Sequence, residues 1–134
     1  MFKRKVHFTT NVELSEQQVV WLNAGVEHFN AGRFWHAHED WEDLWKSLKG
    51  VAEQKLVDGV QGLIQIAAML LNHERKKVRG VTNLWAKASA KLDPVMGGLF
   101  GIDVASLYLD SEPFHQDVQQ FKMTANHVKI KQQS

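Results

Sequence analysis

The chain has 134 residues, a formal net charge of +1 and no cysteine. This length fits one domain with a buried core, and we expect that domain to span residues 1–134. The lack of cysteine excludes disulfide bonds and thiolate metal sites. The near-neutral charge argues against nucleic-acid binding. No apolar stretch is long enough to span a bilayer, and the basic residues 1–5 are not followed by the apolar run of a signal peptide. The sequence therefore predicts a soluble, cytoplasmic protein with no membrane contact.

The N-terminal part of the chain predicts an irregular arm followed by a helix. Residues 1–14 carry no helical pattern. Ser15 with Gln18 three residues later fits a capping box, so a first helix is expected to begin there. Gly32 is suited to the left-handed position that ends a helix. A short connection follows, which predicts that the next helix folds back against the first.

The middle of the chain predicts two longer helices. A second helix is expected over Phe34–Leu48, with its apolar residues on one face. A third, over residues 52–72, is apolar nearly all round, which is typical of a central buried helix. Gly59 and Gly62 lie within it and predict the close approach of a neighbouring helix.

The rest of the chain predicts shorter elements. A fourth helix is expected over Val78–Leu92, Asp103 is expected to cap a short helix through Leu109, and Pro113 is expected to open a last helix. The polar tail, residues 129–134, is expected to fray. Because strand-type alternation is sustained nowhere, the fold class is all-α, a compact single-domain bundle of about five to six helices around the central third helix.

The second predicted helix carries the most informative polar residues. His38 and Glu42 are four residues apart, so they stack on the same side of the helix. A histidine and a carboxylate at this spacing can bind one metal ion or form an acid–base pair. With Glu39 the run also approaches the zinc-protease pattern, but the second histidine is missing. The neighbouring Trp41 and Trp45 are expected to form an aromatic wall in the core.

Two glutamines extend this polar set to the third helix. Gln61 and Gln65 lie along one line of a helix expected to be central, so their amides need partners. His38, Glu42 and Gln65 then form one polar cluster between two helices. Such clusters fix helix register as often as they bind ligands, and an internal polar network is the favoured interpretation.

Two further features of the sequence give weaker indications of a functional site. His73 leads into the basic residues 75–79, a run that fits either an anion site or a solvated turn, and we favour the turn. Trp35 is turned away from the core face of its helix. An exposed large aromatic side chain is typical of a partner surface, which includes a homodimer.

The motifs of these helices together resemble one known family. The run over residues 29–45 contains the pattern A-H-E-x-x-E-x-x-W, and residues 61–68 and 79–80 resemble two later blocks of the same family, known as domain of unknown function 309. The resemblance covers about residues 22 to 92 and implies an intracellular all-helical domain without an established activity. This chain has His36 where the family often has an acidic residue. The motif residues carried over are His38, Glu39, Glu42, Trp45, Gln61 and Gln65.

The sequence leaves two candidate functions open. The favoured one is a binding or structural module whose His/Glu/Gln motif is an inter-helix network, with no cofactor and no metal. The alternative is a small metal-dependent or acid–base enzyme that uses His38, Glu39 and Glu42. Glu39 belongs to the motif although it is turned from the core face, so we expect a helix from Val104 onward, or a second subunit, to cover it. The sequence does not predict which small molecule or metal ion is bound, if any.

Overall fold

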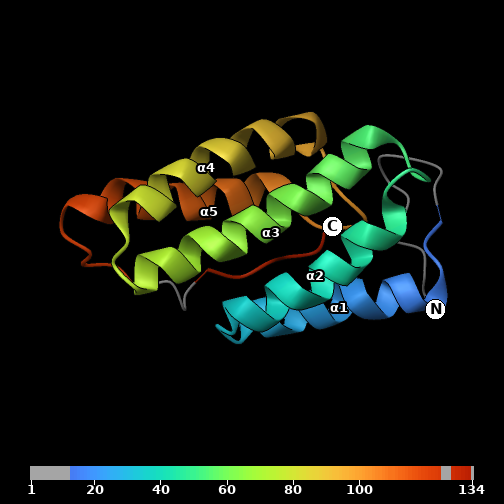
Figure 1. The fold of residues 1–134 in the computed structure, drawn as a ribbon, viewed down its shortest axis with the longest axis horizontal. Helices are drawn as coiled ribbons and strands as arrows, with labels where there is room; N and C mark the ends of the chain where they lie inside the picture. The colour runs from blue at the N-terminus through green and yellow to red at the C-terminus, as the bar shows by residue number, and fades with distance from the viewer. Residues whose placement is uncertain (1–12, 125–127, 134) are drawn as a thin grey trace.

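The computed structural model describes residues 13–124 and 128–133. In these ranges the regular structure is helical apart from two isolated β-bridges (Figure 1), which confirms the predicted all-α bundle. Of the arm predicted over residues 1–14, residues 1–12 lie outside the described residues, and residues 13–14 are irregular as expected. The elements are α1 Glu16–Asn30, α2 Phe34–Leu48, α3 Gln54–Glu74, α4 Val78–Leu92, the 3₁₀ turn η2 Asp93–Val95, α5 Val104–Gln116 and the 3₁₀ turn η3 Asp117–Gln119.

The helices α1 and α2 form an antiparallel hairpin. The predicted capping box starts α1, because Ser15 Oγ accepts a hydrogen bond from Gln18 N at 3.1 Å and Ser15 N donates to Gln18 Oε1 at 2.8 Å. Gly32 has a φ of 80° in the turn between the two helices, where a side chain would be strained. The buried Trp41 of α2 donates from Nε1 to the backbone oxygen of Leu22 at 3.2 Å. This bond ties the hairpin together at its centre.

The helix α3 is the centre of the bundle, as predicted. It runs between α2 and α4, and α5 lies behind it (Figure 1). A side chain at Gly62 would meet Leu92, and one at Gly59 would meet Val95 and Leu99. The two glycines therefore allow α4 and the segment after it to approach α3 closely.

The predicted boundaries near the C-terminus are wrong. One helix, α5, runs unbroken over Val104–Gln116 with Pro113 inside it, and no new helix opens at Pro113 in the described residues. Asp103 caps it as expected, accepting from Ser106 N at 3.1 Å. Proline lacks an N–H and normally weakens a helix. Here the buried positions Leu107, Ser111 and Phe114 follow one helical stripe, so packing continues past the proline.

The C-terminal segment also differs from the expectation of a frayed tail from residue 129. Val128 and Ile130 are buried. The Asn30 side chain donates from Nδ2 to Ile130 O at 3.2 Å and accepts from Ile130 N at 2.6 Å. A bridge between Ile102 and Gln132 holds the same segment further along. Its two apolar side chains and the amide of Asn30 fix it to the bundle despite its polar composition.

None of the helices described, within residues 13–124 and 128–133, has the length and apolar character needed to cross a membrane.

Candidate functional site

The helix α2 presents two opposite flanks. One flank faces α1, because Asp40 Oδ2 lies 2.7 Å from His28 Nδ1 and Ser47 Oγ accepts from Gln18 Nε2 at 3.1 Å. At 100° per residue, the motif side chains of α2 lie on the opposite flank. These motif side chains are His38, Glu42 and Trp45.

The helix α3 has one partly exposed stripe, which includes Gln61 and Gln65. The stripe continues to Asp58, whose Oδ1 lies 3.4 Å from Lys91 Nζ of α4. Asp58, Gln61 and Gln65 are all partly exposed, so the neighbouring helices leave this stripe of α3 incompletely covered. We call His38, Glu42, Trp45, Gln61 and Gln65 the motif face.

All five residues of the motif face are partly exposed, whereas Trp41 is fully buried. The structure thus divides the predicted aromatic wall: Trp41 lies in the core and Trp45 lies at its edge, with Lys49 Nζ 4.5 Å from its ring centroid. Glu39 is exposed. The helix from Val104 packs against α3 and α4 and leaves Glu39 uncovered, so the expectation of intramolecular cover by that helix is wrong.

Three atoms of the motif face are buried without a hydrogen-bond partner among the described residues: His38 Nδ1, Trp45 Nε1 and Gln65 Oε1. The predicted network between His38, Glu42 and Gln65 is therefore not closed by hydrogen bonds at these atoms. The His38 ring instead stacks on Trp35, with centroids 5.1 Å apart and planes 10° apart. Trp35 is 51% exposed. An aromatic stack thus borders the motif face at the surface.

The predicted acid–base and metal chemistry finds little support in these positions. No ion pair joins His38 to a carboxylate in the part of the chain that the structure describes, and no group of three or more histidine, aspartate or glutamate side chains there is arranged to hold a metal ion. The donor set of a small metalloenzyme is thus not assembled around His38 by the described residues.

Two polar pairs were not predicted from the sequence. One is His28 with Asp40, described above. The other is His73 with Asp117, whose Nε2 and Oδ2 atoms lie 2.8 Å apart. Both pairs join residues that are distant in sequence, and neither follows a helical spacing. No local pattern could therefore have found them.

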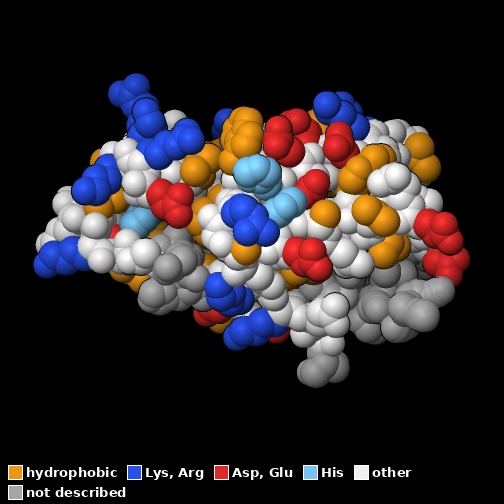
Figure 2. Space-filling model, turned by 90° about the horizontal axis from the view of Figure 1, so that it is seen from below, with side chains coloured by type: hydrophobic (Ala, Val, Ile, Leu, Met, Phe, Trp, Pro, Cys, Tyr) orange, Lys and Arg blue, Asp and Glu red, His pale blue; other side chains and the backbone are white. Residues whose placement is uncertain are grey.

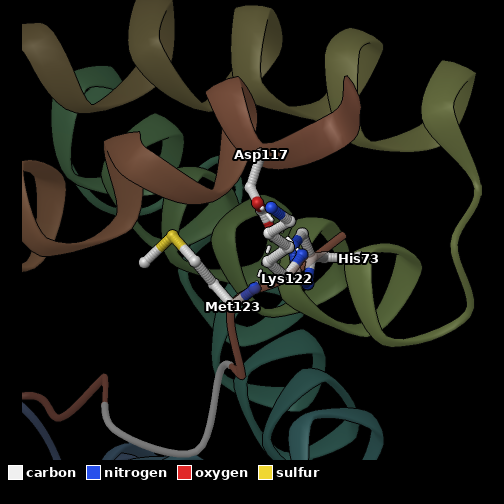
Figure 3. Close-up of polar contacts among 4 residues, drawn as sticks. All are labelled: His73, Asp117, Lys122 and Met123. Atoms are coloured by element: carbon white, nitrogen blue, oxygen red, sulfur yellow. Dashed lines mark hydrogen bonds and ion pairs between the residues drawn. The ribbon is translucent and has the colours of Figure 1, made fainter. Parts of the chain in front are cut away.

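The pair of His73 and Asp117 fastens the end of α5 to α3 (Figure 3). His73 is 3% exposed, so it is not part of the basic run that follows it. Asp117 also accepts hydrogen bonds from the backbone N–H groups of Lys122 and Met123, at 3.1 and 2.8 Å. The bond from Met123 does most to lower the pKa of Asp117 below its ordinary value, and the bond to His73 lowers it further. This cluster holds the turn after α5 in place.

The fold and the motif face define a class of small helical bundles that carry a polar motif over two adjacent helices. A family model described as "Domain of unknown function (DUF309)" matches residues 22–84 of the chain. This match confirms the predicted resemblance and supports the assignment of the chain to that family. The matched range contains every residue of the motif face. No curated protein shows significant similarity to the chain.

Proposed function

We propose that the protein is a cytoplasmic binding module without a reaction of its own, and that the motif face is the surface through which it contacts a partner. The observation that carries this proposal is the set of unpartnered buried atoms at His38, Trp45 and Gln65. A buried polar atom without a partner costs about 1–3 kcal/mol of folding free energy. Three such atoms beside one surface lower the free energy of unfolding, and local violations of this kind are expected where residues serve binding rather than stability.

The neighbouring aromatic stack supports the same proposal. Tryptophan is among the residue types enriched in the side chains that dominate binding energy at interfaces. The exposed ring of Trp35 is held in one orientation by His38. A side chain that is already ordered loses little conformational entropy when a partner covers it.

A second copy of the chain is the partner that we propose. Glu39 and Asp43 of α2 are exposed, and the turn between α3 and α4 together with the first turn of α4 exposes four basic residues. One copy thus offers both signs of charge to another, which favours a specific orientation on contact. The four basic residues are Arg75, Lys76, Lys77 and Arg79.

The stability of matched variants tests whether the motif serves binding or folding. We expect Gln65→Met to keep or raise the free energy of unfolding, by up to about 1 kcal/mol, because an unpartnered buried acceptor is removed at nearly constant volume. Urea unfolding at neutral pH measures this change. A loss of more than about 1 kcal/mol would show that Gln65 supports the fold, and would contradict the proposal.

The two tryptophans of α2 provide the control. Trp41→Phe removes the bond to Leu22 O and leaves a gap in the core, so it is expected to cost about 2 kcal/mol or more. Trp45→Phe removes an N–H that has no partner in the described residues, so its cost should be clearly smaller. Equal losses for both variants would count against a binding role for Trp45.

A further inference from the structure

We propose that His28 and His36 form a surface site for a divalent transition-metal ion, and that Asp40 orients His28 for this role. The site lies on the hairpin of α1 and α2, on the flank opposite to the motif face, and does not depend on the binding role proposed there. Figure 2 shows histidine side chains gathered near the middle of the face seen from below, beside acidic and basic side chains. The rings of His28 and His36 have centroids 5.3 Å apart.

This separation is compatible with two imidazoles bound to one metal ion. An imidazole nitrogen binds zinc at about 2.0 Å and lies about 1.1 Å from the centre of its own ring, so two imidazoles on one tetrahedral ion have centroids about 5 Å apart. The observed 5.3 Å matches that value. The planes are 45° apart, and each ring can turn about its metal–nitrogen bond without changing the centroid distance much.

The carboxylate of Asp40 fixes which nitrogen of His28 is free. Its Oδ2 lies 2.7 Å from Nδ1 of His28 and can only accept, so Nδ1 carries a proton and donates a hydrogen bond to Asp40. In the neutral ring the Nε2 atom then has the free lone pair, which is the form of histidine that binds metals. In histidines that bind metals, the N–H of the other ring nitrogen usually donates a hydrogen bond to a group such as a carboxylate, as it does here. Asp40 is thus a positioning residue and not a ligand.

The site is accessible to solvent. The His28 and Asp40 side chains are 29% and 24% exposed, and His36 is exposed. Two protein ligands give a weaker site than the three or four of dedicated zinc centres. Sites built from imidazole bind divalent metals in a general order of affinity. We expect this site to follow it, with copper(II) bound more tightly than nickel(II) or zinc.

Titration calorimetry on the full chain without an affinity tag tests the site. Zinc chloride and nickel chloride are the probes, added at neutral pH to protein freed of metal with a chelator. We expect one equivalent of each ion to bind, and His28→Ala or His36→Ala to weaken binding at least tenfold. Asp40→Asn should weaken it by about 10- to 100-fold, because the proton on Nδ1 is no longer fixed.

Two controls keep the result interpretable. His115→Asn changes a histidine that stacks on Trp85, away from the hairpin, and should leave binding unchanged. Nitrogen-15 NMR of the rings should show the signal of His28 Nε2 shifting with zinc while Nδ1 stays protonated. Absence of saturable binding in the parent protein would overturn the proposal. Binding that survives the loss of both His28 and His36 would overturn it equally.

Discussion

The indole of Trp41 fills a space that only a glycine leaves free. A side chain on Gly25 of α1 would fall inside van der Waals contact with the Trp41 ring, which is fully buried and cannot move aside. At this point α1 and α2 approach closely, and the indole N–H can reach the backbone of α1. The contact explains why a glycine is found in the middle of a helix, where it costs about 1 kcal/mol relative to alanine.

We expect Gly25→Ala to lower the free energy of unfolding by about 1–3 kcal/mol, because the added methyl group overfills the core. Gly97→Ala is the matched control, since a side chain at Gly97 meets nothing within 4 Å. Thermal and urea unfolding of both variants measure the difference. A Gly25→Ala variant as stable as the Gly97→Ala variant would show that the Trp41 contact is not tight.

The pair of the buried His73 and the partly exposed Asp117 predicts that stability depends on pH in the acidic range. The pKa of Asp117 is lowered in the folded state, chiefly by the hydrogen bond from Met123 N. Its charged form therefore stabilises the fold above the ordinary aspartate pKa of about 3.9, and that stabilisation is lost as pH falls through the lowered value. We expect the stability difference between the parent and Asp117→Asn to be constant above about pH 5 and to shrink below about pH 4.

Urea unfolding of the parent and of Asp117→Asn, repeated from neutral to acidic pH, measures this difference. A difference that stays constant down to the most acidic pH at which both proteins fold would contradict the lowered pKa. Asp110→Asn is the control, since Asp110 is exposed on the same helix, and its difference from the parent should change little with pH.

Residue patterns predicted local contacts far better than distant ones. The prediction of a capping box at Ser15 and Gln18 was confirmed, because both partners lie within one turn of helix. The pairs of His28 with Asp40 and His73 with Asp117 depend on how separate helices cross, which no local spacing encodes. For the same reason the partial exposure of Gln65, and its lack of a partner among the described residues, could not be derived from a helical wheel.

The cap of α5 shows how one residue sets the start of an element. Asp103 accepts from the backbone N–H of Ser106 at 3.1 Å and from the Ser106 hydroxyl at 2.7 Å. The bond from the Ser106 hydroxyl does most to lower the pKa of Asp103, and the bond from the Ser106 N–H lowers it further. The bond from the Ser106 N–H satisfies a backbone group at the first turn that the helix itself leaves unpaired.

We expect Asp103→Ala to lower the free energy of unfolding by about 0.5–2 kcal/mol, the usual cost of removing an N-terminal cap. Asp110→Ala is the control, since it removes an exposed carboxylate further along the same helix. Urea unfolding at neutral pH compares the two. If both variants lose the same stability, the hydrogen bonds of Asp103 do not stabilise α5.

Element boundaries were predicted well where a local signal decides them. The bounds of α2 and α4 match the structure, and α1 begins one residue after its cap. Pro113 misled the prediction, because proline favours a helix start and its tolerance inside α5 depends on buried contacts with the rest of the bundle. The start of α3 also lies two residues later than predicted.

At the scale of the whole molecule, the C-terminal segment packs against the first hairpin, which is formed by α1 and α2. Asn30, at the end of α1, exchanges two hydrogen bonds with the backbone of Ile130. Residues 100 positions apart are thereby joined. The polar composition of the tail gave no sign of this, since its anchoring combines two buried apolar side chains, Val128 and Ile130, with hydrogen bonds to residues distant in sequence.

We expect Asn30→Ala to lower the free energy of unfolding by about 1–3 kcal/mol, because it leaves the backbone groups of Ile130 unpaired. The segment over residues 128–133 should also lose protection in amide hydrogen exchange, while α3 keeps its own. Asn83→Ala, at an exposed position of α4, is the control. Unchanged exchange in residues 128–133 would show that the segment does not depend on Asn30.

The central claim is that the motif face binds a second copy of the chain, and sedimentation equilibrium tests it most directly. The parent protein, 15.3 kDa as a monomer, is compared with Trp35→Ala from micromolar to millimolar concentration. We predict that the parent passes from one copy to two, that Trp35→Ala stays monomeric, and that the NMR signal of the Trp45 indole N–H shifts over the same range. A parent protein that remains monomeric throughout, with an unchanged Trp45 signal, would contradict the claim.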